Sequence, residues 1–369
     1  MDTSKRRLLR GMASLPFVAA FGPEASGQNP AEPRTSLTIE PGREFAPNSY
    51  VHTPLGERDV SVLSTRWVED VQRQIRQNYN VVRVNIDEYA PPIFIAGPDE
   101  PTVRIKAERA DDPSWSFDPF QEQLAGVPLP ENFAPSPGTD GEAIIYQPSS
   151  GRYWEFWRAE KTGRQIENSA GVAVDEWRAA WGGRIDDLGS NPGYFSAPPG
   201  SPRFGTTATG LPLLAGLMTI EEQRAGIIRH PLHIALVETR RGVWMHPAQR
   251  SDGQVDDDAA IPEGATFRLP LDLDLDGLAL TPYCKMIARA VQEYGMTVRD
   301  KAGAVVLYGE NPLASLDASH PYYGRDGILG CPGGEFAWSC SPDTNNLLRN
   351  FPWSSLVALD ALLMSDEPQ

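Results

Sequence analysis

The stretch GEAIIYQPSSGRYWEFW, Gly141–Trp157, contains two apolar runs separated by the turn-forming segment PSSG. Aromatic and β-branched residues fill both runs, so the stretch predicts an antiparallel hairpin. Counting outward from the turn places Tyr153 opposite Tyr146, and the same register places Glu155 opposite Ile144. The run VDEWRAAWGGRID that follows predicts a third strand of the same meander.

The composition of the chain favours a loop-rich β protein. Its 369 residues include 33 glycines and 34 prolines, and only 22% are charged, which favours many turns over a helical bundle. Strand-like runs outnumber helical ones and do not alternate with them. The predicted fold class is mainly β, an antiparallel β-sandwich of the jelly-roll kind with peripheral helices.

Several further segments have a periodicity that predicts secondary structure. Apolar residues four apart predict a helix over Arg66–Tyr79, and a second amphipathic helix is predicted from Pro282 to Gly295. The runs MTVRD and AVVLYGE, separated by KAG, predict a hairpin, and HPLHIALVET predicts an inner strand. Thr219 is expected to start a helix, whereas no period holds over Asp112–Asn132, which predicts an irregular connection.

The N-terminus predicts export. Arg6 and Arg7 precede a short, weakly apolar stretch, a pattern typical of a bacterial twin-arginine signal. We expect residues 1–28 to form this signal and residues 29–369 to form a single β-rich domain with an α+β N-terminal portion. The mature protein is then secreted or periplasmic, with no membrane association after signal cleavage. A basic disordered tail is the alternative for the first residues.

The formal charge of −16 restricts the partners of the protein. With 49 acidic against 33 basic side chains, the chain is poorly suited to bind a phosphate backbone, so no nucleic acid is expected. An acidic surface is compatible with neutral or cationic glycans. A strongly anionic polymer would require arginines that cluster locally.

The three cysteines suggest a disulfide rather than a metal site. Cys331 and Cys340 bracket CPGGEFAWSC, which can close a disulfide in an oxidising compartment, and Cys284 is expected to be buried. No metal and no cofactor are expected. The segment DLDLDG at 272–277 opens like a calcium loop, but Tyr283 occupies the twelfth position, where a glutamate is needed.

Three residues are the candidate catalytic groups: Glu155, Asp140 and His230. On a strand Glu155 shares a face with Tyr153 and Trp157, and aromatic neighbours would raise its pKa as a general acid requires. Asp140, Glu142 and Glu155 lie within the predicted hairpin, and Glu142 lies one diagonal step from Glu155 if both side chains face the same way. The alternative is that these carboxylates lie on a solvated sheet face, or that Asp140 only forms a turn.

His230 precedes an apolar strand and follows Arg229, whose charge would favour a neutral imidazole able to act as a base. A histidine hydrogen-bonded at the rim of a strand is the structural alternative. Aromatic residues that can stack on sugars, and polar loop residues that can bind hydroxyl groups, form the expected substrate-binding set: Tyr153, Trp157, Trp181, Arg184, Asp186 and Tyr194. An internal ion pair is the alternative for Arg184 and Asp186.

The segments TDGEAIIYQPSSGRYWEFWRA, ATGLPLLAGLMTIEEQRAGIIRHPLHIALVET and EYGMTVRDKAGAVVLYGENP are similar to a group of exported bacterial proteins, frequent in actinomycetes, whose function is not established. The resemblance covers roughly Gly138 to Pro352. In that group the first motif often has His where this chain has Glu142, whereas Asp140 and His230 match. The resemblance implies export but no reaction.

The resulting hypothesis is a secreted enzyme that degrades a polysaccharide, a glycoside hydrolase first and a polysaccharide lyase second. A lyase would use Tyr153 or His230 as the base and Arg184 to neutralise a uronate. The alternative is a non-catalytic glycan-binding or cell-envelope-associated protein. A protease or esterase ranks last because no nucleophile motif is present. For a catalytic Glu155, replacement by glutamine is expected to preserve the fold and lower turnover.

Overall fold

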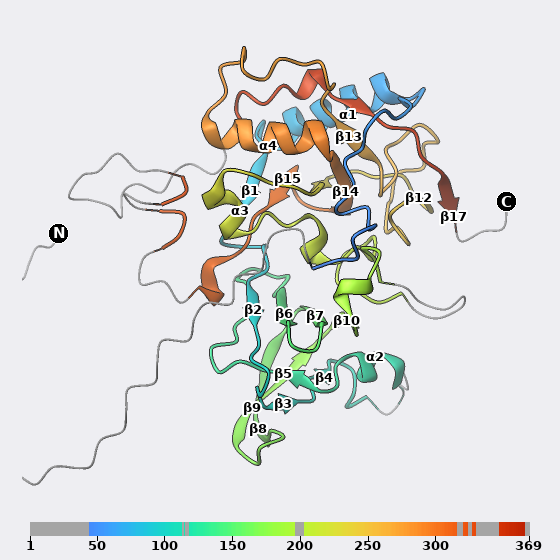
Figure 1. The fold of residues 1–369 in the computed structure, drawn as a ribbon. Helices are drawn as coiled ribbons and strands as arrows, with labels where there is room; N and C mark the ends of the chain where they lie inside the picture. Colours follow the sequence, from blue (N-terminus) through green and yellow to red (C-terminus); the bar gives the residue numbers. More distant parts are fainter. Residues whose placement is uncertain are drawn as a thin grey trace, which may run out of the picture. The chain divides into compact units, whose positions relative to one another are not determined.

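The predicted hairpin lies at the centre of a four-stranded sheet in the computed structural model of the protein (Figure 1). The structure describes residues 44–112, 114, 118–195, 203–315, 320–323, 327–329 and 347–365. All of them belong to one unit, Leu37–Gln369. The sheet has the order β10-β7-β6-β2, with β2 at Ile93–Ile95, β6 at Ala143–Gln147, β7 at Arg152–Trp157 and β10 at Trp181–Ile185.

The register of the hairpin is the predicted one. Tyr153 lies opposite Tyr146, and Glu155 lies opposite Ile144. Strand β10 pairs antiparallel with β7, as the predicted meander requires. The run VDEWRAAWGGRID is not one strand, however, because its first half forms β9 (Ala173–Ala179) in a separate sheet and only its second half forms β10. The sequence of β6 begins with a continuous apolar run rather than an alternating pattern, because both faces of the strand are buried there.

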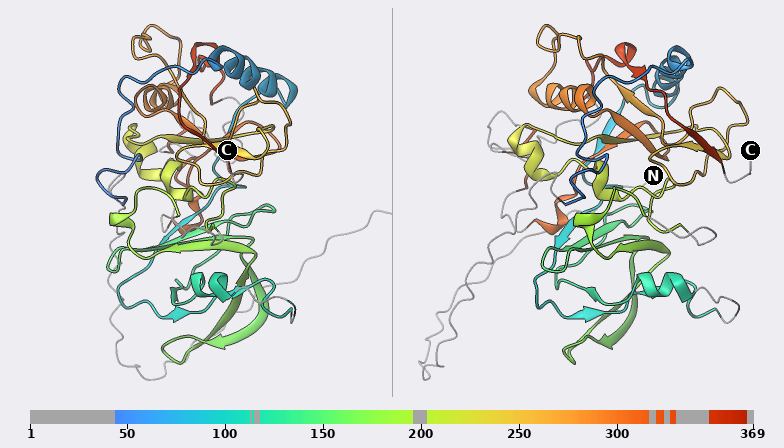
Figure 2. Two further views of the ribbon diagram at one scale, coloured as in Figure 1. Left: turned by 90° about the vertical axis from the view of Figure 1, so that its right-hand side faces the viewer. Right: turned by 45° about the vertical axis from the view of Figure 1, so that its right-hand side comes forward.

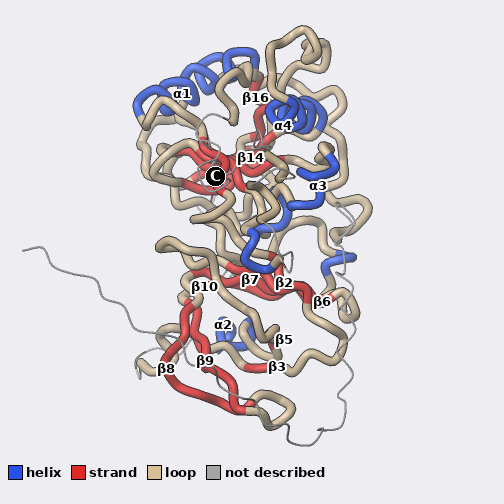
Figure 3. Tube along the Cα trace, turned by 90° about the vertical axis from the view of Figure 1, so that its left-hand side faces the viewer, coloured by secondary structure: helices blue, strands red, loops and turns tan. Residues whose placement is uncertain are grey.

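The larger sheet has six strands in the order β1-β15-β11-β14-β13-β16. Its strands are β1 (Arg83–Asn85), β11 (Leu232–Leu236), β13 (Thr266–Arg268), β14 (Met296–Lys301), β15 (Val306–Tyr308) and β16 (Val357–Ala358). Helices α1 (Ser64–Gln77) and α4 (Pro282–Glu293) lie on the side of this sheet that faces away from the four-stranded sheet (Figures 2 and 3).

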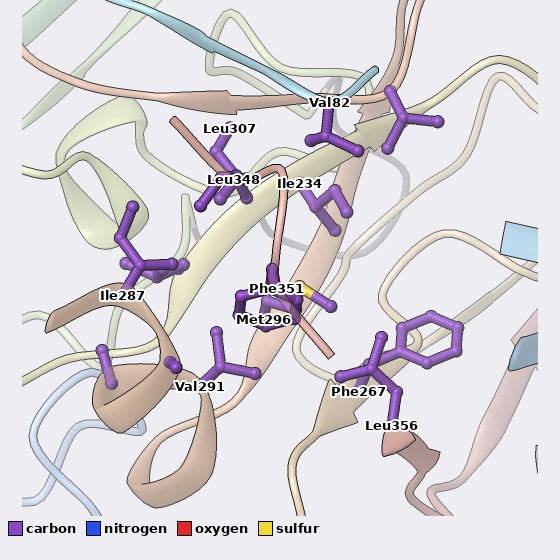
Figure 4. Packing of buried hydrophobic residues seen from close by; sticks show 14 of the residues in the cluster. Val82, Ile234, Phe267, Ile287, Val291, Met296, Leu307, Leu348, Phe351 and Leu356 are labelled. Atoms are coloured by element: carbon purple, nitrogen blue, oxygen red, sulfur yellow. The ribbon is translucent and has the colours of Figure 1, made fainter. Parts of the chain in front are cut away.

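The core beneath α1 and α4 explains why both predicted helices form. Val71 of α1, Ile287 and Val291 of α4, and Ile234 of β11 belong to one buried apolar cluster (Figure 4). Burial of such a face stabilises an amphipathic helix far more than its intrinsic propensity does. Thr281 caps α4 by accepting a hydrogen bond from the backbone N–H of Cys284.

The segment DLDLDG has a structural role at this helix. The carboxylate of Asp276 lies 3.1 Å from Nζ of Lys285 and 3.0 Å from a guanidinium nitrogen of Arg289, both on α4. Asp274 accepts hydrogen bonds from the backbone N–H groups of Asp276 and Gly277, as in an Asx turn.

The predicted hairpin of MTVRD and AVVLYGE is wrong. These segments form β14 and β15, but β11 lies between them, parallel to β14 and antiparallel to β15. The short KAG connection resembles a hairpin turn, yet the chain crosses β11 there. The apolar sequence of β11 favours this central position because all five of its residues are buried.

The remaining elements are short or lie at the edges. Helix α2 and strand β5 lie within the connection that was expected to be irregular, and Thr219 caps α3 through a capping box. The bounds are β3 Thr102–Val103, β4 Lys106–Ala107, α2 Asp118–Gln123, β5 Val127–Pro128, β8 Glu160–Glu167, β9 Ala173–Ala179, η1 Leu188–Ser190, η2 Leu213–Gly216, α3 Ile220–Ala225, β12 Val243–Met245, η3 Pro312–Ala314, η5 Trp353–Ser355 and β17 Leu363–Ser365.

The mainly β class is confirmed, since the described residues form seventeen strands in several sheets and four α-helices. The jelly-roll arrangement is not confirmed. Four strand pairings are parallel, namely β1 with β15, β11 with β14, β2 with β6 and β4 with β9. Jelly rolls are built from antiparallel hairpins, so the sheet order here follows a different connectivity.

Some predictions fall on residues that the structure does not describe. Arg6, Arg7, Cys331 and Cys340 lie outside the described residues. Cys284 is described, and its thiol is buried and free, as expected. Across the described ranges, no helix combines the length and the apolar character that a membrane span needs.

Candidate functional site

The two larger sheets share a buried layer that contains both apolar and charged side chains. Ile144 and Tyr153 from the four-stranded sheet belong to the same cluster as Ala235, Val306 and Tyr308 from the six-stranded sheet. The loop that ends in η2 also contributes to this cluster. Titratable side chains of both sheets, among them Glu142 and Arg299, lie in or beside this layer, which makes it the candidate site.

A β-bulge brings two consecutive charged residues to this layer. Ile234 of β11 lies opposite Val298 of β14, whereas the next residue, Ala235, lies opposite Asp300. Arg299 is therefore the extra residue of the bulge, with no residue of β11 opposite it. A β-bulge of this kind changes the direction in which neighbouring side chains point. In a regular strand Arg299 and Asp300 would point to opposite faces. Here both contact groups of the buried layer.

Arg299 is buried and incompletely paired. The residue is 2% exposed, and its guanidinium carbon lies 3.6 Å from the ring centroid of Tyr308 in a cation–π contact. Its Nη2 atom lies 3.9 Å from Oε2 of Glu142, which is beyond hydrogen-bonding distance. The Nε and Nη1 atoms have no hydrogen-bond partner among the described residues.

Glu142 is the carboxyl group opposite Arg299. The residue is 6% exposed and precedes β6, where Ser136 fixes its backbone with two hydrogen bonds. Burial raises the pKa of Glu142 to about 8, and the charges of Asp140 and Asp300 add to this shift, while Arg299 opposes it. Burial therefore favours the protonated form of Glu142.

The segment from 203 to 213 packs against this layer, and one arginine makes four hydrogen bonds to its backbone. Arg250 donates hydrogen bonds to four backbone carbonyls, those of Arg203, Gly205, Thr207 and Ala208. The segment in turn gives the backbone N–H of Ala208 to Oδ2 of Asp300 at 3.1 Å. Burial raises the pKa of Asp300 to about 6 in spite of this bond and of the Arg299 charge.

Asp140 and the half-buried Trp157 contact each other beside Glu142. Nε1 of Trp157 donates to Oδ1 of Asp140 at 3.4 Å, and the backbone N–H of Arg158 donates to the Asp140 carbonyl at 2.7 Å. Arg158 has a φ of 51°, a left-handed conformation that is uncommon outside glycine. Trp181 of β10 lies opposite Trp157 of β7, but its ring stacks on those of Phe120 and Phe204, with centroids 4.4 and 5.9 Å apart. We call Asp140, Glu142, Arg299, Asp300 and Tyr308 the Arg299 cluster.

Glu155, the first predicted catalytic residue, is completely buried and accepts four hydrogen bonds. Its Oε1 accepts from the backbone N–H and the hydroxyl of Thr206, at 2.6 and 3.0 Å. Its Oε2 accepts from the hydroxyl of Tyr153 at 2.6 Å and from the backbone N–H of Leu213 at 2.8 Å. Burial raises the pKa of Glu155, as expected, although the four donors act in the opposite direction. These bonds tie the 206–213 segment to β7, which is a structural role.

His230 forms a buried ion pair rather than a free base. Its Nδ1 lies 2.8 Å from the carbonyl oxygen of Pro231, and its Nε2 lies 3.1 Å from Oε2 of Glu222. Burial alone would lower the pKa of His230, but the carboxylate of Glu222 raises it above its ordinary value. Arg229 is exposed and does not set the charge state. Both ring nitrogens are engaged as donors, an arrangement that does not suit a proton acceptor.

The predicted substrate-binding residues are spread over several environments. Tyr153 is buried and donates to Glu155, whereas Trp157 is half-buried beside Asp140, and the Trp181 ring stacks on two phenylalanines. Arg184 forms the internal pair with Asp186, at 2.8 Å, and donates to the carbonyl of Glu122. The Tyr194 ring contacts His246 edge-on, with centroids 6.3 Å apart. The structure thus brings together Asp140 and Trp157 but not the whole set.

The sequence did not reveal Arg299, Asp300 or Tyr308 as candidates. Within MTVRD the only available signal was a charged pair in an otherwise buried strand, and such a pair more often marks the solvated end of a strand. Glu142 had been noted only for its diagonal relation to Glu155. In the described part of the chain, no group of three or more His, Cys, Asp or Glu is arranged to hold a metal ion.

Comparisons with known proteins add no family to this description. No protein-family model matches the chain, and neither the curated proteins nor the solved structures include a significant match. The resemblance to exported actinomycete proteins therefore stays a prediction.

Proposed function

We propose that the protein is a polysaccharide-degrading enzyme in which Glu142 is the general acid and Asp140 its partner carboxylate. The single observation that carries the proposal is a buried carboxyl group, its pKa raised to about 8 by burial, beside a half-buried aspartate that contacts the indole of Trp157. A general acid needs a pKa near or above the working pH, and indoles stack on sugar rings.

The proposed reaction is hydrolysis of a glycosidic bond. Glu142 donates its proton to the leaving glycosidic oxygen, while Asp140 accepts a proton from the water that attacks the anomeric carbon. The resulting Glu142 carboxylate lies near the Arg299 guanidinium, which lowers its cost of ionisation. Glu155 acts indirectly, since it holds the segment that contributes the backbone N–H of Ala208 to the Arg299 cluster.

Replacement of Glu142 tests this proposal. Glu142→Gln is expected to lower kcat by about 10²-fold on the best substrate of a panel of neutral and acidic polysaccharides, because no proton can then reach the leaving group. Reducing-end release measures hydrolysis, and ultraviolet absorbance of an unsaturated product would reveal elimination instead. Glu69→Gln, an exposed glutamate on α1, is the matched control and should retain full activity.

The pH profile provides a second readout. Because the pKa of Glu142 is about 8, kcat/KM should fall as pH rises above about 8, and this limb should disappear in Glu142→Gln. Absence of turnover on every polysaccharide, with retained binding, would support the glycan-binding alternative. Equal turnover by parent and Glu142→Gln would exclude Glu142 as the acid.

We also propose that the protein leaves the cytoplasm by the twin-arginine route. Replacing both Arg6 and Arg7 by lysine is expected to abolish processing and to leave the precursor in the cytoplasm, because that route selects on the arginine pair. Immunoblots of fractionated cells measure precursor and mature protein. Normal export of the double variant would show that another signal is used.

A further inference from the structure

We propose that the Arg299 cluster binds the carboxylate of an acidic sugar residue, so that the substrate class is a uronate-containing polysaccharide. This inference rests on the proposed function, which it narrows from polysaccharides in general to those with acidic residues. It concerns the recognition of one substrate group and adds no step to the reaction.

The unpaired donors of Arg299 are the main observation. Two of its three nitrogens, Nε and Nη1, have no acceptor among the described residues, although the residue is only 2% exposed. A buried donor without an acceptor costs about 1–3 kcal/mol, and more when the group is charged. A ligand that supplies acceptor oxygens at this position would remove this cost.

The charge of Arg299 favours a carboxylate over a sugar hydroxyl. The guanidinium is always protonated, and its ion-pair partner among the described residues, Oε2 of Glu142, lies 3.9 Å away, beyond hydrogen-bonding distance. A buried charge without a hydrogen-bonded counterion is unfavourable, and an anionic ligand would complete the pair. Arginine also pairs with carboxylates more strongly than with neutral acceptors.

The acidic groups around Arg299 direct their hydrogen bonds elsewhere. The charges of Glu142, Asp300 and Glu155 act on Arg299, while burial keeps the pKa of the Tyr308 hydroxyl above its ordinary range. Burial also raises the pKa of Glu142 to about 8, which favours its neutral form. Backbone N–H groups engage the carboxylate of Asp300, and four donors engage that of Glu155. The guanidinium therefore keeps donors for an incoming carboxylate.

His233 is a second buried polar side chain without a partner. It is 0% exposed, and neither ring nitrogen has a hydrogen-bond partner among the described residues. On β11 it lies opposite Thr297, two residues before Arg299 on β14. Burial lowers the pKa of His233 well below its ordinary value, and the Arg299 charge adds to this, so the ring is neutral and keeps one N–H donor. Its position is fixed, because any side chain at Gly216 would collide with the ring.

The net charge of the protein does not oppose this inference. The chain carries −16, which disfavours anionic polymers at a distance. The proposed contact is short-ranged and buried, however, and a buried pair is screened little by salt. We therefore expect slow or weak encounter with an acidic polymer but a defined preference for its carboxylate once bound.

Binding of monosaccharides tests the inference without a requirement for turnover. Glucuronate and galacturonate should raise the melting temperature of the full-length parent protein, whereas glucose and galactose at equal concentration should not. Titration calorimetry should give at least a tenfold weaker affinity for Arg299→Lys, because lysine cannot reproduce the guanidinium donors. Glu69→Gln is the control with unchanged binding.

If circular dichroism shows that Arg299→Lys does not fold, the inference can be tested on the parent protein with an altered ligand. Methyl galacturonate ester keeps the sugar but removes the negative charge, so the parent protein should lose at least tenfold in affinity for it. Equal affinity for the ester, or for the neutral sugars, would overturn the inference. Failure of the parent to bind either uronate would also overturn it and would indicate that the cluster holds only solvent.

These outcomes separate the inference from the proposed function. Turnover of neutral polysaccharides that depends on Glu142, without any preference for uronates, would keep the function and reject the inference. Binding of uronates that depends on Arg299, without turnover of any polysaccharide, would keep the inference and reject the enzyme. The two proposals therefore fail on different measurements.

Discussion

Glu155→Gln is expected to destabilise the protein by about 3 kcal/mol, and Glu155→Ala by about 4 kcal/mol. The reason is the set of four donors that meet the two carboxylate oxygens. An amide nitrogen in place of either oxygen faces a backbone N–H, that of Thr206 or that of Leu213. Neither group can rotate away, so one buried donor loses its acceptor.

Urea unfolding followed by tryptophan fluorescence measures this effect, since the chain has nine tryptophans. Glu160→Gln is the matched control. Glu160 is exposed on β8 and pairs with Arg178 at the surface, so its replacement should change the free energy of unfolding by less than about 0.5 kcal/mol. A fully stable Glu155→Gln variant with greatly reduced turnover would contradict the structural role and restore Glu155 as a candidate acid.

The ion pair of His230 with Glu222 is expected to make stability depend on pH. His230→Gln should lower the free energy of unfolding by about 3–5 kcal/mol near pH 6, because it leaves a buried carboxylate without its partner. Removal of one member of a buried pair has this large effect even where the intact pair contributes little. Urea unfolding at a series of pH values provides the measurement.

The direction of the pH dependence follows from the two shifts. The folded pKa of His230 is raised above its ordinary value of 6.5, so its contribution is complete below pH 6.5 and is lost as pH rises through the folded pKa. The folded pKa of Glu222 is lowered from 4.5, so its contribution is present above pH 4.5 and is lost as pH falls through the folded pKa. The pair therefore stabilises most between pH 4.5 and 6.5.

A double-mutant cycle with Glu222→Gln isolates the interaction of the two side chains. The coupling free energy should be largest inside this window and should decrease toward pH 9. A coupling that does not vary with pH would mean that His230 stays neutral, which would make it available again as a base.

The local pattern around the hairpin was sufficient to predict its register. The segment PSSG fixed the turn, and the apolar runs on either side fixed which residues oppose each other, so the position of Glu155 opposite Ile144 is correct. The helix α4 could also be predicted, because its apolar spacing, Pro282 in its first turn and Gly295 after its end agree. These features depend on neighbours within one or two turns of chain.

The role of Glu155 could not be predicted in the same way. The sequence showed aromatic neighbours and a raised pKa, and both are present. The donors that determine its role, however, come from Thr206 and Leu213, more than fifty residues away. A buried acid that donates protons and a buried carboxylate that anchors a loop have the same local sequence. Only the partners distinguish them.

The sequence by itself determined the mainly β class, the central hairpin, the two amphipathic helices and the acidic charge. Tertiary structure decided that β11 separates β14 from β15, that a bulge at Arg299 turns two charges toward one layer, and that four donors engage Glu155 while burial raises the pKa of Glu142. The physical reason is the separation along the chain of the residues that interact. Turns, caps and periodicity act between near neighbours in the chain, whereas strand order, desolvation and the pairing of charges depend on segments that meet only in the folded protein.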